Sequence, residues 1–136
     1  MRRPGALLLA ACALALSGCG QLDLTPEGDP SRVVQGEVNL GDTALPPDAV
    51  VTVRVVDPSQ TPPLTLGSQT IRSPGASPVP FKVDFRAEDD LLRRGLNIEA
   101  RVSIGGHLRF YNVDRYVVTL GNITGTQRIR VNPTGP

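Results

Sequence analysis

The sequence predicts an all-β domain, an antiparallel β-sandwich of seven to eight short strands with one short helical turn, or a small open barrel of the same strands. Short runs that alternate apolar and polar side chains recur along the chain, and β-branched residues are frequent in them. Proline and glycine separate these runs at short intervals, as is typical of turns. The chain has no tryptophan and no cysteine pair within the runs, so the hallmarks of the immunoglobulin family are missing.

The first half of the domain holds four expected strands. They cover residues 33–40, 49–57, 64–72 and 81–86. The second is the clearest, because Val51, Val53 and Val55 share one face while Thr52 and Arg54 share the other. A glycine in the middle of the third strand indicates a bulge.

The second half begins with the helical turn. Acidic side chains open the segment 87–94 and arginines close it, which suits the helix dipole, and Gly95 can end it. Four further strands are expected at residues 96–104, 107–113, 116–120 and 128–131. Gly105 and Gly106 separate the first two of these, which predicts a tight hairpin turn of the I′ or II′ type.

The N-terminus has the pattern of a lipoprotein signal. Two arginines at positions 2 and 3 precede an uncharged apolar run over residues 6–16, and small residues follow it. A cationic head, a short apolar core and a small-residue exit indicate a secretory signal peptide. The run Leu16-Ser17-Gly18-Cys19 resembles the bacterial lipobox, in which the cysteine thiol receives a diacylglycerol and the peptidase cuts before the cysteine. The resemblance implies cleavage between Gly18 and Cys19, and acyl chains on Cys19.

Other interpretations of this segment fit less well. A transmembrane helix needs about 20 apolar residues, and the run is shorter. A rival lipobox ends at Cys12, but cleavage there would leave almost no apolar core before the site. A plain secreted protein with an unmodified cysteine stays open. The chain therefore divides into a signal peptide (residues 1–18), an acylated cysteine with a polar, proline-containing flexible tether (19–32) and a β-sandwich domain (33–132).

Composition excludes several classes of partner and cofactor. Once Arg2 and Arg3 leave with the signal, 12 of the 14 basic residues remain against 13 acidic ones, so no basic surface predicts a nucleic-acid partner. With Cys19 acylated and Cys12 removed, the domain has no disulfide and no thiolate ligand for a metal. We therefore expect no cofactor and no metal site.

No constellation of residues predicts catalysis. His107 is the single histidine and follows the glycine turn, where an exposed hairpin residue is expected. The acidic run Glu88-Asp89-Asp90 lacks the spacing of a calcium loop and is expected at a solvated helix start. Asn122 opens a glycosylation sequon, which we regard as accidental behind a bacterial lipobox. Aromatic residues near the hairpin would be candidate partner contacts if they are exposed.

Four segments carry a resemblance to a known family. They read GEV at 36–38, LPPDAVVTVRVVD at 45–57, IRSPGASPVPF at 71–81 and ARVSIGGHLRF at 100–110. In this order and spacing, over residues 33–120, they resemble the YbaY-type envelope lipoproteins, which are grouped with the YscW-type lipoprotein chaperones (pilotins) of type III secretion. The resemblance implies a small β-sandwich lipoprotein without catalytic residues, and its pilotin members bind a secretin subunit and help deliver it to the outer membrane.

These observations predict a lipid-anchored, non-enzymatic envelope protein that binds or chaperones another envelope or secretion-system protein, with its acyl chains in the membrane. Gly20 rather than Asp follows Cys19, which resembles the class destined for the outer membrane, at its periplasmic face or the cell surface, if the cell has two membranes. Two alternatives stay open. One is a small-ligand or glycan-binding lipoprotein, which would need converging Asp, Arg and Tyr side chains. The other is a passive structural envelope protein.

Overall fold

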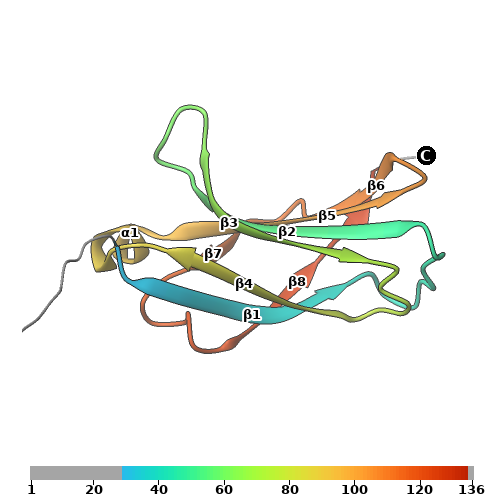
Figure 1. Ribbon diagram of the computed structural model, residues 1–136, viewed down its shortest axis with the longest axis horizontal. Coiled ribbons are helices and arrows are strands. Elements are labelled where there is room, and N and C mark those ends of the chain that lie inside the picture. Colours follow the sequence, from blue (N-terminus) through green and yellow to red (C-terminus); the bar gives the residue numbers. More distant parts are fainter. Residues whose placement is uncertain (1–28, 135–136) are drawn as a thin grey trace, which may run out of the picture.

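Two β-sheets pack face to face in this domain (Figure 1). The computed structural model describes residues 29–134. The strands are β1 (Ser31–Asn39), β2 (Ala49–Asp57), β3 (Leu64–Arg72), β4 (Val79–Arg86), β5 (Leu96–Ile104), β6 (His107–Tyr111), β7 (Tyr116–Val118), β8 (Thr126–Arg130) and β9 (Asn132–Pro133), and the helix is α1 (Asp89–Arg94). One sheet has the order β4-β1-β8, and the other has the order β3-β2-β5-β6-β9, with β7 also paired to β5. The predicted β-sandwich with one short helical turn is confirmed.

Alternating side chains place one face of each sheet in the core. In β2, Val51, Val53 and Val55 are fully buried, whereas Thr52 and Arg54 are partly exposed. β2 pairs antiparallel with β3 on one side and with β5 on the other. The most clearly predicted strand is therefore interior to its sheet. Burial of one valine side chain contributes about 1.5–3 kcal/mol, so these rows are a main source of stability.

The opposing sheet and the helix complete the core. Every second residue of β4 is buried, beginning with Val79 and ending with Phe85. Val34 and Val38 of β1 are fully buried beside them. Leu92, the buried residue of α1, joins the same cluster. The alternation predicted for residues 81–86 is confirmed.

On one side of the sandwich, β3 approaches β4. The Lys82 amide on β4 donates a hydrogen bond of 2.7 Å to the side-chain oxygen of Gln69 on β3. A Cβ atom on Gly67 would overlap the backbone carbonyl of Asp84, so the missing side chain permits this close approach. The register of β3 against β2 shifts just after the Val55–Gly67 pair. The bulge predicted in this strand is confirmed.

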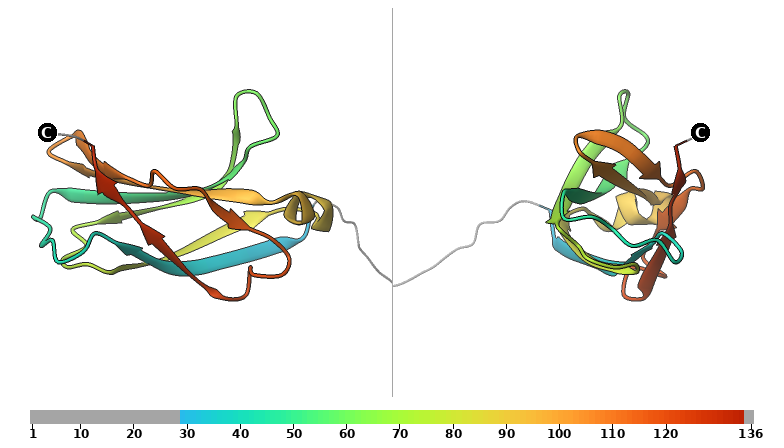
Figure 2. Two further views of the ribbon diagram at one scale, coloured as in Figure 1. Left: turned by 180° about the vertical axis from the view of Figure 1, so that it is seen from behind. Right: turned by 90° about the vertical axis from the view of Figure 1, so that its right-hand side faces the viewer.

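On the other side, β8 connects the two sheets. β8 pairs with β1 in parallel, which differs from the antiparallel pattern expected throughout. The chain then continues into the other sheet, where β9 pairs with β6 (Figure 2). Across this side the hydroxyl of Tyr116 on β7 accepts a hydrogen bond of 2.9 Å from the Arg130 amide on β8.

Gly36 is the point at which β8 crosses β1. Gly36 pairs with Gln127, and a Cβ atom on Gly36 would overlap the Gln127 backbone. Val38, two residues later, is fully buried. The GEV segment therefore has a physical explanation, because its glycine permits the crossing and its valine fills the core.

Several element boundaries differ from the expected ones. β1 begins at Ser31, and α1 covers only the last six residues of the expected helical turn. β6 ends at Tyr111 because the next residue, Asn112, accepts the hydrogen bond of the Ala100 amide with its side chain instead of its backbone carbonyl. β7 has three residues, and β8 begins two residues before the expected start. β9, which brings the strands of the described chain to nine, is two residues long and includes a proline. Positive φ angles at Gly105 and Gly106 agree with the predicted tight turn.

The connection between β2 and β3 projects from the body of the domain (Figure 1). Its start is held by Asp57, whose side chain accepts hydrogen bonds from the Ser59 amide at 2.9 Å and the Ser59 hydroxyl at 2.7 Å. Asp57 is only 3% exposed. The bond from the Ser59 hydroxyl is the largest cause that lowers the pKa of Asp57, and it outweighs the opposing effect of burial.

We expect Gly36→Ala to destabilise the domain by about 3 kcal/mol, because the added methyl group must displace the β8 backbone. Gly121→Ala is the matched control, since a Cβ atom there meets nothing closer than 3.7 Å. Urea unfolding of the two variants measures the difference. Equal unfolding midpoints would contradict the proposed role of Gly36.

We expect Asp57→Asn to lower the free energy of unfolding by about 1–2 kcal/mol at pH 7, because the charged acceptor of two hydrogen bonds is lost. The folded-state pKa of Asp57 lies below its ordinary value of 3.8. Its contribution is therefore complete above that value and disappears as the pH falls through the folded-state pKa.

Unfolding of wild type and Asp57→Asn between pH 7 and pH 2 tests this linkage. The difference between the two proteins should shrink below about pH 4. Asp42→Asn is the control, because Asp42 is exposed. A difference that stays constant down to pH 2 would contradict the assignment.

Candidate functional site

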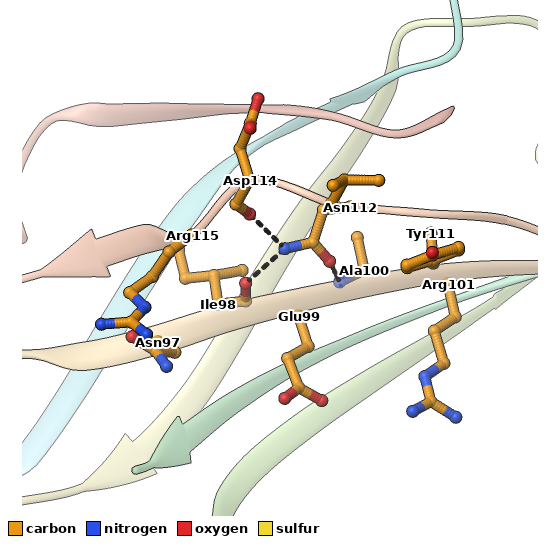
Figure 3. Close-up of a pocket in the computed structure, with 10 residues that line it drawn as sticks. Asn97, Ile98, Glu99, Ala100, Arg101, Tyr111, Asn112, Asp114 and Arg115 are labelled. Carbon is orange, nitrogen blue, oxygen red and sulfur yellow. Dashed lines mark hydrogen bonds between the residues drawn. The ribbon is translucent and has the colours of Figure 1, made fainter. Parts of the chain in front are cut away.

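A hollow of about 240 Å³ lies on β5, between the segments that pair with its two ends. β6 pairs with residues 101–104 of β5, and β7 pairs with residues 96–98. Glu99 and Ala100 therefore have no strand beside them on that edge in the described chain. The connection from Tyr111 to Arg115 passes over this gap and forms one wall of the hollow (Figure 3).

Asn112 takes the place of the missing strand. Its side-chain oxygen accepts a hydrogen bond of 2.7 Å from the Ala100 amide, and its side-chain nitrogen donates to Ile98 O at 3.2 Å and Asp114 O at 2.9 Å (Figure 3). The Asn112 backbone amide donates to Ala100 O at 3.2 Å. The β5 edge is thus satisfied by one side chain, which makes this wall of the hollow rigid.

Polar side chains of β5 face outward into the hollow. Asn97, Glu99 and Arg101 alternate with buried residues and so share the outer face. Tyr111 lies directly opposite Arg101 in the β5–β6 register, which places its ring on the same face. Glu99 forms an ion pair with Arg54 of β2. Figure 3 shows Glu99 and Arg101 projecting from the same side of β5.

Two arginines of the hollow are free to bind a ligand. Within residues 29–134, the guanidinium groups of Arg101 and Arg115 form no ion pair and no hydrogen bond. Tyr111 is 40% exposed, and Val113 at the rim is 63% exposed. The hollow therefore combines an accessible aromatic ring with two unpaired cations.

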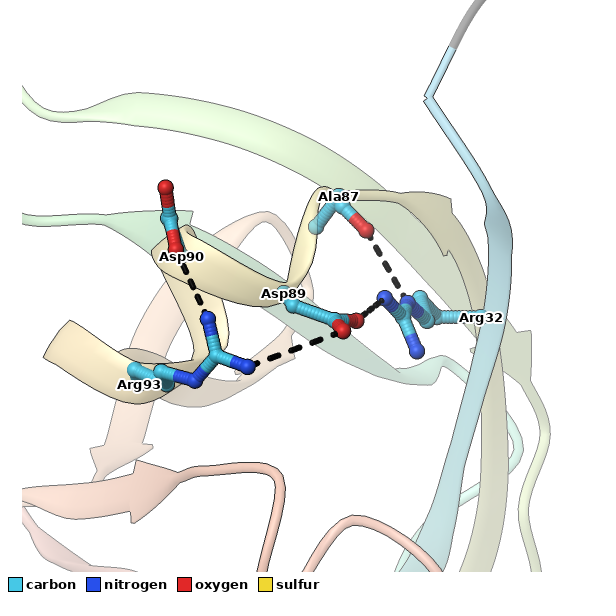
Figure 4. A network of polar contacts seen from close by, with 5 residues as sticks. All are labelled: Arg32, Ala87, Asp89, Asp90 and Arg93. Carbon is cyan, nitrogen blue, oxygen red and sulfur yellow. Dashed lines mark hydrogen bonds and ion pairs between the residues drawn. The ribbon is translucent and has the colours of Figure 1, made fainter.

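A second polar network fixes the place where the chain enters the domain (Figure 4). Arg32 of β1 donates through Nε to Ala87 O at 2.9 Å and pairs through Nη2 with Asp89 of α1. Arg93 pairs with Asp90 at 2.8 Å and lies 3.9 Å from Asp89. Acidic residues at the start and arginines at the end of α1 also suit its dipole. This network connects β1 to the helix.

Residues just before β1 are held at the same end of the domain. The Arg86 guanidinium donates to Asp29 O at 2.9 Å, and the Ala87 amide donates to Pro30 O at 3.1 Å. Both contacts are made by β4 and the residue that follows it. The described chain therefore starts from a defined position beside α1.

The structure does not describe the predicted lipidation and cleavage residues, because Gly18 and Cys19 lie outside residues 29–134. His107 is exposed at the hairpin turn, as expected. Asn122 uses its side chain locally: the oxygen accepts from the Thr119 amide at 2.8 Å, and the nitrogen donates to Val117 O at 2.9 Å. Neither His107 nor Asn122 lines the hollow.

Residues 29–134 hold neither a cluster of metal ligands nor a membrane-spanning helix. No group of three or more His, Cys, Asp or Glu side chains there is placed to hold a metal ion. Glu88, Asp89 and Asp90 lie at the start of α1, where two of them pair with arginines. No helix in this part of the chain has both the length and the apolar character to cross a membrane.

The hollow was only partly visible in the sequence. The alternation of residues 96–104 assigns Asn97, Glu99 and Arg101 to one face, and the glycine turn brings the next strand alongside. The positions of Asn112 and Arg115 follow from the irregular connection after β6, which has no periodic signal. Sequence reasoning therefore pointed to the aromatic residues of the hairpin, of which Tyr111 is exposed in the hollow, but it missed the rest of the site.

Comparisons with known proteins agree with this architecture. The model of the type III secretion system lipoprotein chaperone family (YscW) matches residues 29–131. A solved structure titled as an alternative pilotin from the type II secretion system of Vibrio cholerae superposes with a TM-score of 0.66 at 23% identity, over 79% of this chain and 100% of that one. No curated protein sequence matches the chain.

The pilotin structure supports the fold, and the family model covers nearly all of the described residues. The YscW part of the predicted resemblance is confirmed, while the YbaY-type grouping stays a prediction. The chain belongs to the type III secretion system lipoprotein chaperone (YscW) family.

Proposed function

We propose that the protein is a lipid-anchored, non-enzymatic chaperone that binds another protein of the cell envelope, as a pilotin does. The observation that carries this proposal is the family match over residues 29–131. A lipobox-like sequence lies directly before this domain, as a lipoprotein chaperone requires. The partner would be a secretin or another subunit of a secretion system.

The anchor in this proposal is Cys19, freed by cleavage after Gly18 and then acylated. Each buried CH₂ group contributes about 0.8 kcal/mol, so two or three acyl chains hold the protein where one would not. Gly20 after the cysteine favours the outer membrane in a cell with two membranes. In this proposal the residues between Cys19 and the domain form a flexible tether, which would let the domain move roughly 15–20 Å from the anchor.

The outer edge of β8 is the strand edge that best suits a partner. Two other edges carry a side-chain cap, because Gln69 accepts a hydrogen bond from the Lys82 amide of β4 and Asn122 donates one to Val117 O of β7. In the described chain β8 pairs with β1 alone. On the edge of β8 that faces away from β1, the Arg130 amide is the one backbone group that a described side chain, Tyr116, caps. An extended partner segment could therefore add to β8 by backbone hydrogen bonds.

We expect Cys19→Ser to abolish incorporation of labelled palmitate in cells, because the acylated thiol is removed. Cys12→Ser is the matched control, and it should keep full labelling. If Cys19→Ser were labelled and Cys12→Ser were not, acylation would belong to the rival site. Thermal unfolding of the purified variants should give equal midpoints, since both residues lie outside the domain.

We expect in-cell crosslinking and affinity purification of the anchored wild type to recover a secretin or assembly subunit of the host in stoichiometric amount. Recovery should fall at least tenfold with Arg128→Pro, which removes the edge amide on the side of β8 opposite β1. Arg72→Pro, on the edge strand β3, is the control.

Unfolding midpoints establish that both proline variants are folded before the comparison is made. Equal recovery with wild type and Arg128→Pro would exclude β8 as the docking edge. Recovery of no assembly subunit above the Cys19→Ser background would contradict the chaperone function itself.

A further inference from the structure

We infer that the hollow on β5 binds a saccharide that carries a carboxylate, with Tyr111 under the sugar ring and Arg101, which lies opposite Tyr111, on the acid, while Arg115 adds positive charge at the other end of the hollow. This site is separate from the proposed docking edge on β8. It depends on the proposed function only through the envelope location, which would bring the domain close to acidic glycans.

Tyr111 provides the platform for the sugar ring. It is 40% exposed and lies opposite Arg101 on the outer face of the sheet. The apolar face of a pyranose ring packs on an aromatic face, while the phenol hydroxyl can hydrogen-bond at the ring edge. Asn112 fixes the chain next to Tyr111 through three side-chain hydrogen bonds, so the platform is positioned before a ligand arrives.

The charges of the hollow favour a carboxylate. Glu99 is neutralised by its ion pair with Arg54. Of the remaining charged side chains, Arg101 and Arg115 are positive and Asp114 is negative, which leaves one positive charge in excess. Figure 3 shows the Asp114 carboxylate directed away from Arg101. Arginine binds carboxylates through paired hydrogen bonds that are stronger than neutral ones.

The polar lining favours a sugar over an apolar peptide. Asn97 offers an amide that is not bound to another described side chain, and it lies beside Arg115 in Figure 3. Planar amide, carboxylate and guanidinium groups match the hydroxyl groups of a sugar. The volume of about 240 Å³ would hold about eight water molecules at ~30 Å³ each, which corresponds to one sugar ring with its substituents.

Two kinds of glycan in a cell envelope contain a sugar with a carboxylate. Peptidoglycan contains muramic acid, whose lactyl group carries the acid, and surface polysaccharides contain uronic acids. The test therefore uses three probes: a disaccharide-peptide fragment of peptidoglycan, a glucuronate-containing disaccharide, and neutral N,N′-diacetylchitobiose. The stem peptide of the fragment, without sugar, is a fourth arm that detects a peptide site instead.

The full-length chain in detergent micelles is titrated with each probe and followed by calorimetry and by tyrosine fluorescence. The chain has two tyrosines and no tryptophan, so its emission reports directly on Tyr111 and Tyr116. At least one acidic saccharide should bind with a Kd on the order of 1 mM and change the emission, and the neutral disaccharide should bind at least tenfold more weakly. Whichever acidic probe binds more tightly identifies the source.

Tyr111→Ala and Arg101→Gln should each weaken binding of that probe about tenfold, whereas Arg72→Gln, on β3 outside the hollow, should not change it. The site is disproved if neither acidic saccharide binds, if the neutral disaccharide binds equally well, or if the stem peptide alone accounts for the affinity. Recovery of the protein partner with Tyr111→Ala is measured in parallel. It should be unchanged, so a failure of the saccharide site is distinguishable from a failure of the chaperone function.

Discussion

The pairing of β1 with strands on both of its sides is the constraint on which the rest of the structure depends. β4 adds to it antiparallel and β8 adds to it in parallel, and β8 then continues into the other sheet as β9. This route is possible because Gly36 has no side chain where the Gln127 backbone crosses it. The two sheets are therefore joined by continuous chain as well as by packing of the valine-rich core. On this side the sandwich depends on the close backbone approach at Gly36, as it depends on the approach at Gly67 on the other side.

Polar side chains satisfy backbone groups at several places where strands diverge. Four side chains hydrogen-bond to strand backbones: Asn112 in the middle of β5, Gln69 on β4, Asn122 on β7 and Tyr116 at the end of β8. Each of these bonds satisfies a backbone group that would otherwise need water or another strand. Such capped edges resist uncontrolled pairing with other chains. Part of the β8 edge lacks such a cap, which is why the proposed docking of a partner is assigned to it.

The three proposed roles belong to different parts of the domain. The Arg32 network fixes the entry of the chain beside α1, so the anchor would act from one end of the sandwich. The β8 edge lies on one side, and the hollow with Tyr111 and Arg101 opens on the outer face of the larger sheet. The lining of the hollow includes no residue of β8, so the two proposed binding surfaces share no residue.

Sequence by itself determined the fold class, the strand at residues 49–57, the acidic start of the helix and the glycine turn, because alternation, charge order and turn residues are local signals. It also supplied the lipobox, on which the proposed anchor rests. Only the tertiary structure decided that β8 runs parallel to β1, that Asn112 replaces a strand, and that Arg115 joins Arg101 and Tyr111 in one hollow. These features depend on contacts between residues far apart or on an irregular connection, and neither leaves a periodic pattern in the chain.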